Sequence, residues 1–332
     1  APTNDSPRAI DDLWHAAVNG RGQYFSAQDP VALVDSLKGA LAGIAAEYGA
    51  GAAAATSTAE PVNGDNFAYV ATYTTGKWVG NLEARQINVA TGSVSQQALW
   101  CTEDIPADPA RNLTACAGSM SSKVAADADT RNIYFNKAGA LTAFTPDNLG
   151  TALSLFDVTK LNQYTAWSAD YKAEATSARL VNYLRGQTGF DARDANTYRF
   201  FRERESTLGD FVGSSPRFVC KASANFTDPG YETFANGLKT GSTCSRTPMV
   251  YIGGNDGMLH AFNANTGAEV WAFVPTPVLG HMWRLADSNY SINHRFFVDG
   301  AVTVEDVCVS GCATESAVWK TILVGTKGRG GT

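Results

Sequence analysis

The chain has 332 residues, of which 44% are hydrophobic and only 17% are charged. Its 26 basic and 32 acidic residues give a formal net charge of −6, which argues against sequence-independent nucleic-acid binding because that function needs a basic surface. The low charge, together with 31 glycines and many aromatic residues, favours a β-rich globular fold with many turns.

Residues 8–48 are the first predicted element, an α-helical region. Asp29 and Pro30 form a favourable helix start, and Gly49 is suited to end the helix. Between them, apolar residues recur every three or four positions: Val34, Leu37, Leu41, Ile44 and Tyr48. The small residues of 49–61 predict a linker, so residues 1–60 are interpreted as a helical tail plus linker. No segment is long and apolar enough to predict a membrane span.

From residue 61 onward the sequence predicts short strands. They are expected at 67–74, 81–89 and 96–100, in a hairpin at 132–144, and at 217–220, 250–254, 258–262, 269–273, 295–309 and 317–326. Residues 146–212 are more polar and predict a helical insertion around LVNYLRG at 180–186. Short strands in units of about 40–50 residues are typical of a β-propeller. We therefore expect residues 61–332 to hold the first blades of an incomplete ring with an open last edge.

One segment, YIGGNDGMLHAFNANTGAEVWAF at 251–273, has the form of a repeat unit. Asn255, Asp256 and Gly257 are predicted to supply the positive φ of a tight turn, and Gly267 that of the next turn. Trp271 is expected to pack over a neighbouring blade with its indole N–H on a carbonyl. FNANTG at 262–267 matches INVATG at 87–92, which indicates a true repeat. All these residues are interpreted as structural.

Six cysteines fall into neighbouring pairs, each bracketing a loop-like stretch: Cys101 and Cys116, Cys220 and Cys244, Cys308 and Cys312. The sequence allows 15 pairings of six cysteines, and we expect disulfides between the nearest neighbours. Metal binding is the alternative, but zinc-like Cys or His spacing is absent. Disulfides imply an oxidising compartment such as the periplasm or cell surface.

Other candidate residues carry no specific catalytic signature. Among the histidines, His15 is assigned to the first helix and His260 to core packing, whereas His281 and His294 are assigned to an inter-blade loop, with a partner surface as the alternative. The acidic pairs Asp11 and Asp12, and Asp191 and Asp194, are interpreted as exposed, and Asp127 and Asp129 as part of a turn. The loop Gly328–Gly331 lacks the residues of a phosphate loop. The sequons at Asn112, Asn225 and Asn289 are not informative. We predict no catalytic, cofactor or metal residue.

The repeat string G-x-N-D-G-x-L-H-A-F-x-A-x-T-G-x-E-x-W resembles quinoprotein-like propeller repeats and, more narrowly, the PilC/PilY family. The narrower resemblance is carried by the segments 11–41, LVNYLRG, YRFFRERESTLGDFVGSSPRFV at 198–219, FFVDGAVTVEDV at 296–307 and ILVGTKGRGG at 322–331. It covers most of the chain in the same order. It implies that residues 1–60 are the tail of a von Willebrand A-like domain and that the chain is a fragment.

The resemblance also implies a function. Members of the PilC/PilY family lie at the tip of type IV pili, contact minor pilins, and act in surface adhesion and in pilus extension and retraction. They carry a calcium loop that does not occur within this sequence, so calcium is expected only in the full-length protein. The alternatives are a pyrroloquinoline-quinone dehydrogenase and an outer-membrane assembly scaffold. The expected function is therefore non-enzymatic, at the cell surface.

Overall fold

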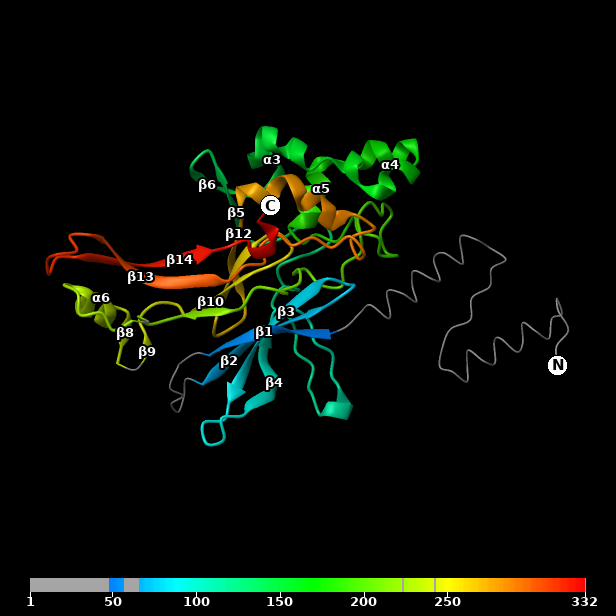
Figure 1. The fold of residues 1–332 in the computed structure, drawn as a ribbon. Helices are drawn as coiled ribbons and strands as arrows, with labels where there is room; N and C mark the ends of the chain where they lie inside the picture. Colours follow the sequence, from blue (N-terminus) through cyan, green and yellow to red (C-terminus); the bar gives the residue numbers. More distant parts are fainter. Residues whose placement is uncertain (1–47, 57–65, 223, 242, 332) are drawn as a thin grey trace.

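A computed structural model describes the backbone of residues 48–56 and the full structure of residues 66–222, 224–241 and 243–331 (Figure 1). The predicted helix at 8–48 lies outside the described residues, except for its last residue. That residue, Tyr48, begins a strand rather than ending a helix, and Gly49 follows inside the strand. The described part is mainly β-structure, with short helices gathered above the largest sheet.

The first sheet contains four antiparallel strands in chain order: β1 (Tyr48–Thr56), β2 (Phe67–Thr74), β3 (Val79–Ile87) and β4 (Val94–Cys101). The three predicted strands of this region are β2, β3 and β4. Alternation along β2 and β3 directs one set of side chains into a core shared with the next sheet. This set includes Tyr69, Ala71, Leu82 and Ala84.

Strand β1 corrects the prediction of a linker at 49–61. Residues 48–56 pair antiparallel with β2, from Tyr48 opposite Thr74 to Thr56 opposite Ala68, with one irregularity between Ala50 and Ala54. Strand pairing uses backbone N–H and C=O groups, which alanine and glycine provide as well as any other residue. The sequence did not indicate this strand, because its small residues do not alternate between apolar and polar.

The largest sheet has six strands in the order β6-β5-β12-β11-β10-β7. They are β5 (Ile133–Lys137), β6 (Ala140–Ala143), β7 (Arg217–Val219), β10 (Met249–Gly253), β11 (Leu259–Asn263) and β12 (Glu269–Val274). Strands β7, β10, β11 and β12 form an antiparallel four-stranded unit, as expected of a blade. However, β12 also pairs in parallel with β5, which joins the earlier hairpin to this unit. No sheet closes on itself within the described residues.

The predicted repeat has the same turn geometry in both copies. In the first, the Gly92 N–H donates to the Asn88 carbonyl (2.7 Å), and in the second the Gly267 N–H donates to the Asn263 carbonyl (2.8 Å). Each asparagine side chain also accepts a backbone N–H two residues later, at 2.9 Å in both turns. Both glycines have a φ of 70°, a conformation that other residues adopt only at a cost. The sequence match at 87–92 and 262–267 therefore reflects one shared turn.

The predicted insertion is helical only in its first part. Its helices are α3 (Pro146–Leu149), η2 (Gly150–Leu155), η3 (Val158–Lys160), η4 (Asn162–Ala166), α4 (Ala169–Glu174) and α5 (Ser177–Leu184). From Arg185 to residue 212 the chain is irregular, which corrects the predicted extent. This stretch still contributes to the core, since Phe200 and Phe201 are buried in it.

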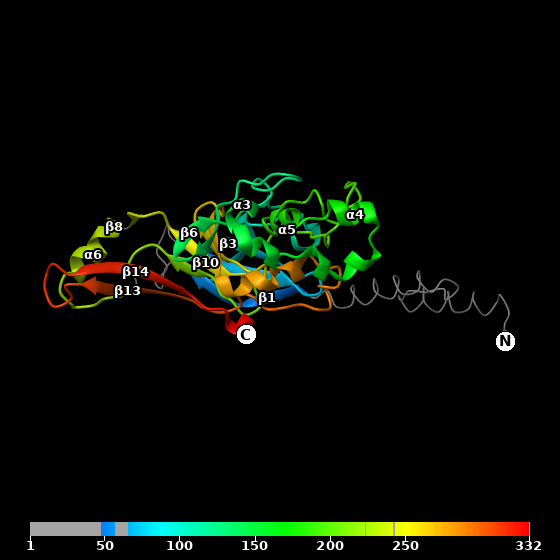
Figure 2. The same ribbon diagram turned by 90° about the horizontal axis from the view of Figure 1, so that it is seen from above.

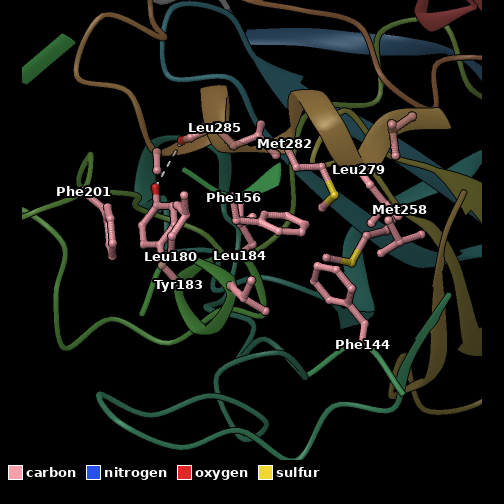
Figure 3. Close-up of a cluster of buried hydrophobic side chains, with 14 of the residues drawn as sticks. Phe144, Phe156, Leu180, Tyr183, Leu184, Phe201, Met258, Leu279, Met282 and Leu285 are labelled. Carbon is pink, nitrogen blue, oxygen red and sulfur yellow. Dashed lines mark hydrogen bonds between the residues drawn. The ribbon is translucent and has the colours of Figure 1, made fainter. Parts of the chain in front are cut away.

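The insertion packs on the large sheet through the main hydrophobic core. Figure 3 shows α5 residues Leu180, Tyr183 and Leu184 beside Met282 and Leu285 of the 3₁₀ helix η5 (Thr276–Ala286). The Tyr183 hydroxyl donates to the Leu285 carbonyl at 3.3 Å. The sequence predicted a loop where η5 lies, because its apolar residues follow the tighter 3₁₀ spacing.

A long arm extends from the large sheet, on one side of the molecule in both views (Figures 1 and 2). It consists of the hairpin β13 (Val302–Ser310) and β14 (Val318–Gly325) together with α6 (Tyr231–Gly237) and the short pair β8 (Lys239–Thr240) and β9 (Thr243–Cys244). Tyr231 and Trp319 join α6 to β14, with ring centroids 4.8 Å apart. The sequence predicted the hairpin but not α6. Two further 3₁₀ helices are η1 (Pro109–Arg111) and η6 (Gly328–Gly330).

The six cysteines form three nearest-neighbour disulfides, as predicted: Cys101–Cys116, Cys220–Cys244 and Cys308–Cys312. The first closes the loop that follows β4. The other two lie in the arm, one across the α6 excursion and one at the tip of the β13–β14 hairpin. The disulfides thus restrain segments that contribute few side chains to the hydrophobic cores.

Candidate functional site

The Asn-Asp-Gly turn between β10 and β11 is buried rather than exposed. Gly257 supplies the positive φ (93°) that was predicted for this turn, whereas Asn255 and Asp256 do not have a positive φ. Their side chains point into the protein, with 1% and 8% of each residue exposed. The turn is therefore a junction for polar contacts between distant segments.

Asn255 connects three parts of the chain. Its amide donates to Asp210 (2.7 Å) and to Asp299 (3.2 Å), and its side-chain oxygen accepts the Phe297 N–H at 2.9 Å. Asp210 also bonds His294 at 2.8 Å. The sequence assigned these residues to different elements: Asn255 to a turn, Asp210 to the helical insertion, His294 to an inter-blade loop, and Phe297 and Asp299 to a strand. The fold brings all of them together at the Asn-Asp-Gly turn.

His294 links this junction to the first sheet. Trp78, in the turn between β2 and β3, stacks on the His294 ring with centroids 3.8 Å apart and donates its indole N–H to the Ser291 carbonyl at 2.8 Å. Trp78 has a φ of 54°, a left-handed conformation that is unfavourable for a bulky residue. His294, which was predicted to lie in a loop, is thus held between the Trp78 ring and the Asp210 carboxylate. His281 lies half-buried in η5, and His15 lies outside the described residues.

A second network of polar side chains includes Asp256. Its carboxylate bonds His260 Nε2 at 3.1 Å, and His260 Nδ1 bonds Glu269 at 2.9 Å. Glu269 then receives two hydrogen bonds from Arg131, at 2.7 and 2.8 Å. Arg131 in turn donates to the Arg185 carbonyl, which ties the blade to the helical insertion. The predicted core position of His260 is confirmed, but its role is ionic as well as steric.

Burial and neighbouring charges together set the ionisation of the side chains in this polar network. Burial alone would lower the pKa of His260, but the carboxylates of Asp256 and Glu269 raise that pKa to about 9. Burial would also raise the pKa of Glu269, whereas Arg131 and His260 hold it well below its ordinary range. The imidazole is therefore charged at neutral pH between ionised carboxylates. Because the His260 side chain is fully buried, a substrate has no access to it, and the arrangement acts as an internal tie.

Two acidic residues that were predicted to be exposed or in a turn are paired with arginines. Asp191, expected to be exposed, is buried and paired with Arg193 at 2.6 Å, whereas Asp194 is exposed. Asp129, expected only in a turn, lies in the turn near residue 125 and also pairs with Arg185. The described residues contain no group of three or more His, Cys, Asp or Glu side chains placed to hold a metal. No helix of the described part is long and apolar enough to cross a membrane.

The described surface has an apolar groove of about 570 Å³ between the large sheet and β14. Its floor includes Tyr134, Leu141, Trp271 and Phe273, and Leu323 forms part of its wall. Trp271 packs against the small core of Leu259, Val298, Val302 and Val304, which joins the large sheet to the arm. Its ring also lies near Tyr251 of the same sheet, with centroids 5.8 Å apart.

Trp100 makes a contact between two sheets of the kind that was predicted for Trp271. It extends from β4 to the turn of the second repeat, where its indole N–H donates to the Ala264 carbonyl at 2.9 Å. A methyl group on Gly267 would lie 2.5 Å from the Trp100 ring. The first sheet thus packs directly on the turn of the blade.

Sequence comparisons assign this architecture to a family. Residues 208–332 match the model of the PilY1 beta-propeller domain. The type IV pilus biogenesis factor PilY1 of Pseudomonas aeruginosa strain UCBPP-PA14 is 34% identical over 99% of this chain. This chain is a relative of PilY1. A PilY1 homolog of Xylella fastidiosa is 32% identical over 93% of the chain. No solved structure matches significantly.

The PilY1 proteins are much longer than this chain. The match spans 26% of the Pseudomonas protein and 21% of the Xylella protein. Within this PilY1 relative, the propeller match begins at Leu208 and includes the blade unit and the arm. The groove lies only partly within it, since Tyr134 and Leu141 of the lining precede residue 208. The first sheet and the helical insertion precede residue 208, but they lie within the 99% of this chain that is similar to the Pseudomonas protein.

Proposed function

We propose that this chain is part of a type IV pilus tip protein that acts without catalysis in pilus assembly and retraction and in surface adhesion. The similarity to pilus biogenesis factors along 99% of the chain carries this proposal. The proposed partners are minor pilins and the surface to which the cell attaches, and the proposed location is the cell surface at the pilus tip. Any calcium site belongs to the longer polypeptide.

The outer face of the arm is the proposed contact surface for a minor pilin. Four apolar side chains on this face are 39–52% exposed: Val309, Val318, Ile322 and Val324. Exposed apolar groups on one face of a β-hairpin favour association with another protein. The Cys308–Cys312 disulfide at the hairpin tip restricts the shape of this surface before binding.

The test replaces Ile322 and Val324 with aspartate in the natural full-length protein. We expect fewer surface pili and reduced twitching motility, with unchanged thermal stability because both side chains are exposed. Ile292→Asp is the matched control, since Ile292 is 80% exposed outside the arm. Normal piliation and motility in the arm variant would rule out this contact surface.

A second measurement addresses the enzymatic alternative. The absorption spectrum of the purified natural protein should lack a quinone chromophore, and redox titration should show no two-electron couple. A bound pyrroloquinoline quinone would contradict the non-enzymatic function, whatever the result for the arm.

A further inference from the structure

The outer face of the first sheet forms one wall of a polar cleft of about 640 Å³. Alternation along β3 directs Leu82 into the core and Asn81 and Glu83 to the opposite face, where they line the cleft. The loop that follows β4 forms the other wall through residues 103–109. The cleft has the size of an ordinary ligand site, and it shares no lining residue with the apolar groove.

The loop is held over the cleft at both of its ends. Asn81 Oδ1 accepts the backbone N–H of Glu103 at 3.0 Å, next to β4. At the far end of the loop, the side-chain oxygen of Gln97 accepts the Thr114 N–H at 3.0 Å. The disulfide of this loop joins the two ends covalently. Walls that are fixed before binding lose less conformational entropy when a ligand enters.

Acidic groups outnumber basic groups in the cleft lining. The lining contains the carboxylates of Glu83, Glu103, Asp104, Asp108 and Glu205 and the guanidinium groups of Arg85 and Arg111. Glu83, Asp108 and Glu205 each form an ion pair, with Arg85 (2.7 Å), Arg111 (2.6 Å) and Lys77 (2.6 Å) respectively. Asp104 is exposed to water. Glu103 is buried, and it has no ion-pair partner within the described residues.

Glu103 has one carboxylate oxygen without a partner. Only 8% of the residue is exposed, and its Oε1 accepts the N–H groups of Thr207 and Leu208, each at 2.8 Å. Its Oε2 accepts no hydrogen bond from any residue that the structure describes. Burial raises the pKa of Glu103 to about 7, although the two N–H groups and the positive charges of Arg131 and Arg204 oppose this rise. A cation bound at Oε2 would offset the cost of burying the charge.

The geometry favours an ammonium ion over a metal ion or a guanidinium group. A metal ion needs several converging ligands, and the described residues contain no group of three or more acidic, His or Cys side chains placed to hold one. A guanidinium group binds best to both oxygens of a carboxylate, but Oε1 of Glu103 already accepts two hydrogen bonds. The single open oxygen suits the compact charge of an ammonium group.

We propose that this cleft binds a lysine side chain of a partner protein, with the ammonium group at Oε2 of Glu103. The cleft is larger than one lysine side chain, so the residues that flank the lysine also have room. Gln96, an exposed side chain of the lining, offers hydrogen bonds to the backbone of such a segment. These features favour a protein segment over a small free amine. The cleft lies outside the arm, and the proposal does not depend on the pilus function.

The experiment titrates the isotope-labelled 332-residue protein with an acetylated and amidated Ala-Lys-Ala peptide at pH 8, followed by NMR. We expect saturable shifts of the Thr207 and Leu208 amide resonances, because both N–H groups bond to Glu103. The same peptide with an acetylated lysine side chain should not bind. Glu103→Gln keeps an acceptor for both N–H groups but loses the charge, and it should weaken binding about tenfold or more. Glu203→Gln, an exposed residue outside the lining, is the matched control and should bind normally.

The pH dependence of binding tests the same contact without a variant. Protonation of Glu103 competes with the ammonium group, so the peptide should bind about tenfold more weakly at pH 6 than at pH 8. No histidine occurs among the described residues that line the cleft, so Glu103 is the group expected to titrate in this range. The difference between the two pH values should vanish in Glu103→Gln.

Four results would overturn the proposal. Equal binding at pH 6 and pH 8, or equal binding of the acetyl-lysine peptide, would show that the charge of Glu103 does not hold the ligand. Equal binding of butylammonium chloride would assign the cleft to small amines rather than to a protein segment. Tighter binding of the corresponding arginine peptide would contradict the choice of lysine.

Discussion

At the scale of single residues, the turn of the blade repeat shows how far local sequence can be interpreted. Gly257 and Gly267 have the positive φ that their turns require, as expected from residue type. The burial of Asn255 and Asp256 could not be predicted, because their partners are distant in sequence. Asn255 and Asp210 are 45 positions apart, and Arg131 and Glu269 are 138 apart. A buried charge network depends on the tertiary fold, and local patterns do not encode it.

The pH dependence of stability should reveal the state of His260. Its folded-state pKa of about 9 lies above the ordinary value of 6.5, so its stabilising contribution is complete below about pH 6.5 and is lost as the pH rises through 9. The full effect is on the order of 3 kcal/mol at most. We expect His260→Gln to lower the free energy of unfolding at pH 6 and to remove the decline between pH 6.5 and 9. Urea unfolding at several pH values measures both. An unchanged pH profile in the variant would show that His260 is neutral in the folded protein.

At the scale of secondary-structure elements, strands were predictable where side chains alternate and turn residues follow. The segments of β2, β5, β10, β11 and β12 meet both conditions, and each is a strand. Strand β1 was missed because its small residues show no period, and α6 because it lies between two cysteines in a stretch resembling a loop. The parallel pairing of β12 with β5 could not be inferred, since more than 130 residues separate Ile133 from Ala272.

The turn between β2 and β3 should anchor the loop at 287–297 through Trp78. We expect Trp78→Ala to increase hydrogen exchange in that loop, because the stacking on His294 and the bond to Ser291 are both lost. Trp78→Gly loses the same contacts but adopts a φ of 54° without strain. It should therefore be more stable than the alanine variant by about 1 kcal/mol. If alanine were the more stable of the two, the left-handed backbone at this position would be in doubt.

At the scale of the whole molecule, the first sheet and the blade share one core. Tyr69, Leu82 and Trp100 of the first sheet pack with Val250 and Phe262 of the large sheet. The sequence predicted most strands of both sheets but not this contact, because it assigned no role to Trp100. The two sheets should accordingly unfold together as one cooperative unit.

Two equivalent glycines test this cooperativity. Gly92 and Gly267 have the same φ of 70°, but a methyl group at 92 would meet nothing within 4 Å, whereas one at 267 would lie 2.5 Å from the Trp100 ring. Gly92→Ala should therefore cost only the backbone strain, about 1–2 kcal/mol. Gly267→Ala should cost a further 1–3 kcal/mol, because it also overpacks the contact between the sheets.

Urea unfolding followed by circular dichroism measures the free energy of unfolding of both variants, and hydrogen exchange shows which strands lose protection. In Gly267→Ala, protection should fall in β2 and β3 as well as in β11. Loss confined to β11 and β12 would mean that the first sheet is stable without the blade, and equal costs for the two substitutions would mean that Trp100 yields to the added methyl group.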